Sequence, residues 1–283
     1  MCKENGNLIP MTHPLALIDF LKLIRWKNIL IYWFTTGLIY YKFHKPTGDN
    51  NIFFYSILFF TMLGIAGNLH NNYTDYDLDK LKTEFVDFDK KLIKKIFLAL
   101  YFLDFILIFF ITPFSQGLFF TIIFLILYNI LLKKIAFIGN FTIALITATS
   151  ILIPFISQSN FKNNLWIFLS LMIIIITLMR ELLKDFEDKE PDKKFKYKTL
   201  PVISFKLSYV TLLIYFIFFY WVLIKYKSLF DIRAYQIFFI FSVLIFIGTT
   251  LNLFRNNWEK TTQYIKILML AGIIYFVYGN NIG

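Results

Sequence analysis

The chain has 283 residues, of which 58% are hydrophobic and 17% charged, whereas soluble domains carry about 45–50% apolar and about 25% charged residues. This balance excludes an ordinary soluble domain, and the single cysteine, Cys2, excludes a secreted fold built on disulfide bonds. The formal net charge is nevertheless +11, so the positions of the charges along the chain decide what they do.

Nine apolar segments follow one another along the chain, and each can be extended to the roughly 17–25 residues that a membrane-spanning helix needs. We therefore predict an all-α polytopic membrane protein with about nine transmembrane helices in a bundle. Before them, the segment Leu15–Lys27 carries Asp19, Lys22 and Arg25 at a spacing of three and is expected to lie at the membrane interface. The expected spans are Asn28–Tyr41, Ile52–Leu69, Ile96–Ile111, Gly117–Leu132, Ile135–Ile156, Leu165–Met179, Leu207–Ile224, Ala234–Leu253 and Tyr264–Tyr278.

Lysine and arginine are divided unevenly between the two ends of these helices. Counted at the nearest helix end, 23 of the 29 fall on the side that holds the N-terminus and 6 fall on the other side. The positive-inside rule assigns the richer side to the cytoplasm. We therefore expect the N-terminus inside and the C-terminus outside a bacterial inner (cell) membrane. Contact with anionic lipid headgroups explains most of the positive charge, and no nucleic-acid partner is expected.

Twelve of the 18 acidic residues fall in two cytoplasmic loops, which follow the second and the sixth expected spans. In each loop, oxygen-bearing side chains are spaced by three and then four residues, and the second set follows the first by 113 residues. This offset equals four helices, so we expect one domain over 1–283 with two four-helix halves, 15–132 and 135–253, and an extra helix at 264–278. The two sets are Asn72, Asp75 and Asp79, and Asp185, Asp188 and Asp192.

Steps of three and four residues put side chains on one face of a helix, so each loop offers a row of carboxylates at the end of a membrane helix. Two such rows facing each other fit divalent cations, because magnesium prefers carboxylate oxygens and is usually completed by substrate phosphates. Neighbouring lysines would then bind a diphosphate directly. These lysines are Lys133, Lys134, Lys193, Lys194, Lys196 and Lys198.

The two loops resemble the two motifs of a known family. Residues 67–79, GNLHNNYTDYDLD, resemble the NDxxDxxxD motif of the UbiA family of intramembrane prenyltransferases. Residues 180–192, RELLKDFEDKEPD, are similar to that family's DxxDxxxD motif, and residues 198–201, KTLP, resemble its (R/K)TLP tail. Weaker matches are Arg25-Trp26-Lys27-Asn28 at the entry to the first helix, and Tyr128, Lys133 and Gly139-Asn140 around the end of the fourth.

The resemblance implies a magnesium-dependent transfer of an isoprenyl group from an allylic isoprenyl diphosphate to a lipophilic acceptor, with release of diphosphate. It implies two Mg²⁺ ions between the loops, held by Asp75, Asp79, Asp185 and Asp188 with Asp192 assisting. The same four aspartates and Lys133 are the expected catalytic residues. The expected substrate-binding residues are Arg25, Asn28, Asn71, Asn72, Tyr128, Lys194 and Lys198.

Several alternatives stay open. Arg180-Glu181 and Lys184-Asp185 resemble the subgroup that attaches geranylgeranyl groups to glyceryl phosphate lipids, but an aromatic quinone precursor is a second possible acceptor. Asn72 stands where the family has aspartate, and Lys196 where it often has glycine, so a non-catalytic paralogue is a third reading. An intramembrane terpene cyclase would need the same ionisation.

A cation or lipid transporter is the alternative from a different class. Transporters place ionisable groups near the middle of the membrane, at broken helices. Here the acidic residues gather at helix ends, and Asp104 is nearly the only one inside an expected span. A charge at that depth is costly and indicates either a function or a partner inside the bundle. The distribution of the other acids favours an enzyme.

Overall fold

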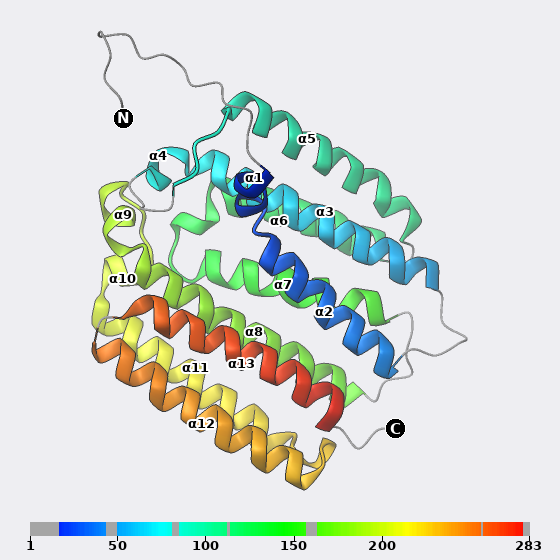
Figure 1. The fold of residues 1–283 in the computed structure, drawn as a ribbon, viewed down its shortest axis with the longest axis vertical. Helices are drawn as coiled ribbons and strands as arrows, with labels where there is room; N and C mark the ends of the chain where they lie inside the picture. Colours follow the sequence, from blue (N-terminus) through cyan, green and yellow to red (C-terminus); the bar gives the residue numbers. More distant parts are fainter. Residues whose placement is uncertain are drawn as a thin grey trace.

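A computed structural model describes residues 17–43, 50–80, 85–111, 114–156, 163–255 and 257–279, and within these ranges the chain is helical and has no β-strand. Nine helices of 16 residues or more in these ranges form one bundle, with their axes roughly aligned (Figure 1). Each overlaps one expected span, so the all-α fold is confirmed. They are α2 (Trp26–Phe43), α3 (Asn50–Thr74), α5 (Lys90–Leu107), α6 (Ser115–Ile130), α7 (Ile138–Ile156), α8 (Asn163–Glu187), α11 (Phe205–Lys225), α12 (Ile232–Phe254) and α13 (Trp258–Gly279).

Six helices of the described part, α3, α7, α8, α11, α12 and α13, are long and apolar enough to cross a membrane. The outer faces of the bundle carry large apolar side chains such as Phe102, Ile217 and Ile237, which are 65%, 69% and 70% exposed. Apolar surface of this extent is unfavourable in water and is typical of contact with lipid. Membrane spanning by α2, α5 and α6, and hence the count of nine spans, stays a prediction.

Buried apolar side chains form two clusters. The first is built mainly from α3, α5 and α6, and the second mainly from α8, α11, α12 and α13. Helix α7 contributes Ile153 to the first cluster and Phe155 to the second, so the two cores meet at this helix. The division of the chain into two repeated halves stays a prediction.

The expected interfacial segment Leu15–Lys27 is split in the structure, and its first two residues lie outside the described ranges. A short helix, α1 (Leu17–Leu23), ends before Arg25, whose φ of 54° lies in the left-handed region. That conformation ends a right-handed helix, so the chain changes direction before α2 begins. Figure 1 shows α1 end-on, whereas α2 runs along the bundle.

Four of the remaining short elements gather at one end of the bundle, toward the left edge of Figure 1. There, Lys198 N donates to Lys134 O and Ala136 N donates to Lys198 O, both at 2.9 Å. A Cβ on Gly139 would lie 2.7 Å from Leu132 O, so glycine lets this loop fold back onto α7. The elements are α4 (Tyr76–Asp79), η2 (Leu132–Lys134), α9 (Lys189–Lys194) and α10 (Leu200–Ile203), whereas η1 (Ile108–Phe110) and η3 (Lys227–Leu229) lie elsewhere.

The backbone of Lys196, at a φ of 60°, gives a first testable prediction. A non-glycine residue in the left-handed region costs about 1–2 kcal/mol, and glycine adopts it freely. Lys196→Gly should therefore stabilise the protein by about 0.5–1 kcal/mol after the added entropy of the unfolded chain is subtracted. Thermal unfolding in detergent measures this shift. Lys193→Gly, inside α9, should instead lower the unfolding midpoint; a loss of similar size in both variants would contradict the prediction.

Candidate active site

Asp75 lies where α3 ends and α4 begins, and its carboxylate is the meeting point of three segments. Lys133 Nζ, from the loop between α6 and α7, is 2.7 Å from Asp75 Oδ2, and these two side chains are only 8% and 13% exposed. Tyr197, from the loop after α9, donates its hydroxyl hydrogen bond to Asp75 Oδ1 at 3.2 Å. The first Asp-rich loop is therefore in direct contact with the tail of the second.

The ammonium of Lys133 has two further oxygen partners. It donates to Asn71 Oδ1 at 3.2 Å and to Thr74 Oγ1 at 2.7 Å. Burial lowers the pKa of Lys133 to about 8, although the adjacent Asp75 carboxylate acts to raise it. The site thus holds one buried positive charge among three oxygens of the first loop.

Carboxylates from both loops surround Tyr197. Burial raises the pKa of the Tyr197 hydroxyl, and the negative charges of Asp75, Asp192 and Asp79 raise it further. Asp192 is buried and accepts a hydrogen bond from Thr199 Oγ1 at 2.9 Å, while its backbone carbonyl accepts from Tyr197 N at 2.9 Å. Asp192 therefore fixes the loop that carries Tyr197.

Asp185 lies in the last turns of α8 and accepts a hydrogen bond from Asn140 Nδ2 at 2.8 Å. Asn140 stands at the start of α7, directly after Gly139. Asp188, between α8 and α9, is half-buried. Across the described residues, no three His, Cys, Asp or Glu side chains are gathered closely enough to hold a metal ion as they stand.

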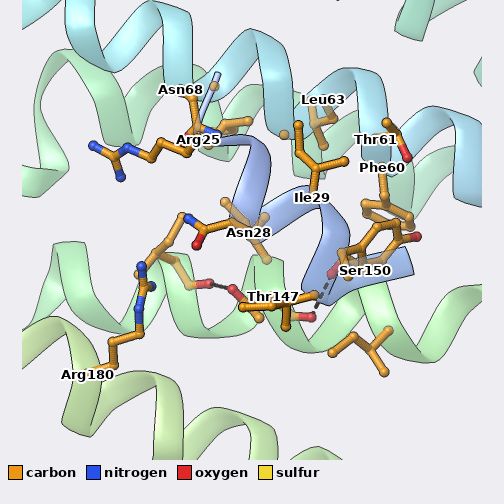
Figure 2. Close-up of a pocket in the computed structure, with 18 of the residues that line it drawn as sticks. Arg25, Asn28, Ile29, Phe60, Thr61, Leu63, Asn68, Thr147, Ser150 and Arg180 are labelled. Atoms are coloured by element: carbon orange, nitrogen blue, oxygen red, sulfur yellow. Dashed lines mark hydrogen bonds between the residues drawn. The ribbon is translucent and has the colours of Figure 1, made fainter. Parts of the chain in front are cut away.

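Two cavities open beside these carboxylates. The inner cavity, of about 280 Å³, lies within the bundle and is lined at depth by apolar side chains such as Ile29, Phe60 and Leu63. Figure 2 shows Arg25 and Arg180 at one end of this cavity, with Phe60 toward the other. The outer cavity, of about 550 Å³, lies at the loop end and is lined by charged and polar residues together with apolar ones such as Trp26 and Phe88. A molecule with a charged head and an apolar tail fits this succession of an outer charged cavity and an inner apolar one.

The two cavities meet at a shared set of residues. All but one of this set carry positive charge, so the passage between the cavities attracts anions. The shared residues are Arg25, Asn28, Arg180, Lys184 and Lys266.

The predicted site residues fall into three groups. Asp75, Asp185, Asp192 and Lys133 form polar contacts at the loop end and line neither cavity, and Asp188 also lines neither. Lys194 and Lys198 have exposed side chains and line neither cavity. The remaining substrate-binding candidates line a cavity: Arg25, Asn28, Asn71 and Tyr128 the inner one, and Arg25, Asn28 and Asn72, together with Asp79, the outer one.

Asn72 has a structural task that its motif position does not suggest. Its side-chain nitrogen donates to Leu23 O at 2.9 Å, and the side chain of Asn68 donates to Ile24 O at 2.9 Å. These two amides hold the end of α1 against α3, directly before Arg25. An aspartate at position 72 cannot make this bond when ionised, because a carboxylate has no hydrogen to donate.

Residues that the sequence analysis did not assign to the site also contribute. Tyr197 and Asn140 bind carboxylates through hydrogen bonds, a role that a search for metal-ligand spacing does not detect. Lys266 lies inside the apolar helix α13, and an ionisable residue inside a span is by itself an indication of function. Arg180 and Lys184 belong to the second motif, and the sequence alone indicates for them only a likeness to a subgroup of the family.

Comparisons with known proteins agree with this architecture. The sequence profile of the UbiA prenyltransferase family matches residues 31–273. A digeranylgeranylglyceryl phosphate synthase of Methanosphaera stadtmanae is 28% identical over 232 residues, which cover 76% of this chain and 82% of that protein.

Two solved structures share the fold. A structure of a digeranylgeranylglyceryl phosphate synthase superimposes with a TM-score of 0.71 at 24% identity, covering 93% of this chain and 98% of that one. A UbiA homolog from Archaeoglobus fulgidus, bound to DMAPP and Mg²⁺, superimposes with a TM-score of 0.62 at 14% identity, covering 91% and 97%.

The contact of Asn72 with Leu23 gives a second prediction. Asn72→Asp removes the donor and places a negative charge beside a carbonyl oxygen, which leaves a polar group unsatisfied and costs about 1–3 kcal/mol locally. Hydrogen-exchange mass spectrometry should show amide exchange in peptides covering 17–28 that is faster by about tenfold. Asn50→Asp is the matched control, because Asn50 uses its side-chain oxygen as an acceptor for Tyr40. Unchanged exchange in the Asn72 variant would contradict the conclusion that Asn72 holds the end of α1 against α3.

Proposed function

Because the chain belongs to the UbiA prenyltransferase family, we propose that this membrane prenyltransferase moves an isoprenyl group from an allylic isoprenyl diphosphate to a glyceryl phosphate lipid and releases diphosphate. The observation that carries this proposal is the hydrogen bond between Asp75 and Tyr197, which joins the two Asp-rich loops beside a cavity with a cationic entrance and an apolar interior. The likeness to a digeranylgeranylglyceryl phosphate synthase supports this acceptor over an aromatic one.

The donor set of the two loops fits magnesium. Carboxylate oxygens are the ligands that this hard cation prefers. The ammonium of Lys133, held by oxygens of Asn71, Thr74 and Asp75, is a cation that the first loop already stabilises. A fold relative with bound DMAPP and Mg²⁺ supports the same cofactor. We assign two Mg²⁺ ions to Asp75, Asp79, Asp185, Asp188 and Asp192.

Bound magnesium would neutralise the charge that grows on the leaving diphosphate. The residues of the chain add to this effect. Lys133 supplies a positive charge in a buried setting, where such a charge stabilises a developing anion more than it would in water. Asn71 and Thr74 hold the Lys133 ammonium in position. Their hydrogen bonds keep this charge fixed when the carbon–oxygen bond of the donor breaks.

Loss of diphosphate leaves an allylic carbocation, which the inner cavity has to protect. Tyr32, Phe60 and Tyr128 line that cavity. Aromatic faces stabilise a cation within about 6 Å by cation–π attraction. The surrounding apolar walls exclude water, which would otherwise capture the carbocation. The hydroxyl oxygen of the acceptor then forms a bond to the carbocation, and its proton passes to the released diphosphate.

The remaining predicted contacts serve the polar parts of the substrates. Arg25, Asn28 and Asn72 lie where the two cavities meet or in the outer one, and we assign them to substrate binding. Lys194 and Lys198, with exposed side chains near the second loop, would attract the incoming diphosphate.

We also propose the orientation of the chain in the membrane. The Asp-rich loops, which hold α4 and α9, lie at one end of the bundle, and most of the lysines belong to segments beside them in the sequence. The positive-inside rule supports a cytoplasmic position for this end, in what we take to be the inner membrane of a bacterium. The polar donor headgroup would then enter from the cytoplasm.

Substitution of the motif carboxylates tests the proposed reaction. With labelled isoprenyl diphosphate, magnesium and a glyceryl phosphate lipid, Asp75→Ala and Asp185→Ala should each lower kcat/KM about 100-fold or more, because an electrostatic contribution to the transition state is lost. Asp77→Ala, at an exposed position of the same motif, should retain near-normal turnover. Normal turnover in both Asp75→Ala and Asp185→Ala would rule out the assigned sites. Release of diphosphate in the absence of any acceptor would favour a cyclase.

Removal of the metal is an independent prediction. A chelator should abolish turnover of the purified wild-type enzyme, and added Mg²⁺ should restore it. Asp75→Ala, with fewer carboxylate ligands, should require a higher Mg²⁺ concentration for half-maximal activity, whereas Asp77→Ala should not. Turnover that is insensitive to chelation would contradict a metal-dependent mechanism.

A further inference from the structure

Four cationic side chains surround the passage between the two cavities, three from α8 and α13 and one from the link between α1 and α2. Arg25, Arg180, Lys184 and Lys266 line both cavities. In Figure 2, Arg25 and Arg180 lie at the same end of the inner cavity with Asn28 between them. This cluster is separate in composition from the contacts of Lys133, which lines neither cavity.

The packing of α13 against α8 explains why these cations come together. Thr262 Oγ1 donates a short hydrogen bond to Glu187 Oε1, which joins the start of α13 to the end of α8. The two helices run in opposite directions along the bundle (Figure 1). On α13, Lys266 follows Thr262 by four residues, about 6 Å along the helix. On α8, Lys184 precedes Glu187 by three residues and Arg180 precedes Lys184 by four. Arg180 and Lys184 of α8 therefore face Lys266 of α13.

The cluster carries more positive charge than the protein balances locally. Glu181 is the only acidic residue that lines the inner cavity in the described part of the chain, against four cations. Its carboxylate is 2.6 Å from Arg180 Nη1, and the charges of Lys184 and Arg25 also act on it. Lys266 is subject to repulsion from Arg180, Lys27 and Arg25, with the carboxylate of Glu187 opposing it. An anion at this passage would relieve that repulsion.

We propose that Arg25, Arg180, Lys184 and Lys266 form a second anion site that binds the phosphate monoester of the acceptor lipid. The inference rests on the proposed function, since it needs an acceptor with a phosphate. A phosphate monoester carries close to two negative charges at neutral pH and several strong acceptor oxygens. Arginine side chains recognise such a group through paired hydrogen bonds, and lysines add point charges.

The inner cavity also offers an apolar surface for the hydrocarbon chain of the same acceptor lipid. Lys266, Met269 and Ile273 follow one another in steps of three and four on one face of α13, and all three line the inner cavity. A headgroup at Lys266 would therefore lead its chain along an apolar surface. Lys184 acts electrostatically on both Lys133 and Glu181, so the second anion site adjoins the diphosphate site. This adjacency suits an acceptor that has to reach the carbon next to the leaving group.

Lys266→Met tests the proposal, because methionine keeps the length of the side chain and removes only its charge. In nanodiscs, the variant should raise the KM for a monoalkyl glyceryl phosphate lipid about 10- to 100-fold, the loss expected for one charge-assisted hydrogen bond. The KM for geranylgeranyl diphosphate should stay within about twofold. Lys266→Arg should restore most of the acceptor affinity. Lys260→Met is the matched control and should behave as wild type, because Lys260 is exposed like Lys266 and lies on the same helix but lines neither cavity.

Further arms identify the source of the phosphate. The same lipid without its phosphate should bind wild type and Lys266→Met equally, and excess phosphatidylglycerol, a bulk diester, should not compete. An equal rise in the KM of the donor would assign the cluster to the diphosphate and overturn the proposal. Competition by phosphatidylglycerol, or an unchanged acceptor KM, would overturn it as well.

A binding arm separates this proposal from the proposed function. Radiolabelled glyceryl phosphate lipid is titrated into wild type and Lys266→Met without donor, and unfolding midpoints confirm that both are folded. Weaker binding by the variant supports the second anion site even if wild type turns over no acceptor. Absence of turnover would then count against the proposed reaction alone. Equal binding by the two proteins would overturn the second anion site alone.

Discussion

The loop end of the bundle depends on the need to balance a mostly buried carboxylate, that of Asp75. An ionised carboxyl group removed from water without partners is costly, and it is tolerated where cations and donors are held against it. Lys133 and Tyr197 meet that need from two distant segments. Their positions in turn require the loop at 132–136 to fold back over α7, which Gly139 permits. One balanced charge thus fixes three loops relative to one another.

This arrangement gives the protein two environments, a polar loop end and an apolar inner cavity. The loop end of the bundle, where the side chains of Lys194 and Lys198 are exposed, is open to water and ions, whereas the inner cavity extends between helices whose outer faces are apolar. An isoprenyl diphosphate has the same division between a charged head and an apolar tail. Ionisation at the boundary would release diphosphate toward water and leave the carbocation among aromatic rings, where it is protected from hydrolysis. The chemistry thus favours a site at the helix ends over one in mid-membrane, where a transporter holds its ions.

The sequence predicted the helices well and their ends less well. The expected span Ile52–Leu69 corresponds to α3, which continues to Thr74, and Leu165–Met179 corresponds to α8, which continues to Glu187. Hydropathy detects the part of a helix that lies in lipid, and these polar extensions, which carry Asn71 and Asp185, project beyond that part. The break at Arg25 was not predictable, because its left-handed backbone is set by tertiary contacts of Asn68 and Asn72.

The same limit applies to the site. Repeated spacing was enough to select Asp75 and Asp185, since the pattern occurs twice. Tyr197 and the residues around Lys266 belong to no repeated pattern, and their role depends on which helices pack against each other. Lys196 is an intermediate case: it stands where the family often has glycine, and its positive φ supplies the physical reason.

The most direct test of a metal site shared by the two loops is a structure of the full chain with Mn²⁺ and a non-reactive isoprenyl diphosphate analogue, in which anomalous scattering locates the metal. Carboxylate oxygens of Asp75 and of Asp185 should both belong to the coordination shells of bound ions, at about 2.1 Å, with the diphosphate completing them. A diphosphate held by Lys133 and the arginines without metal, or metal bound to one loop alone, would contradict a site built from both halves of the chain.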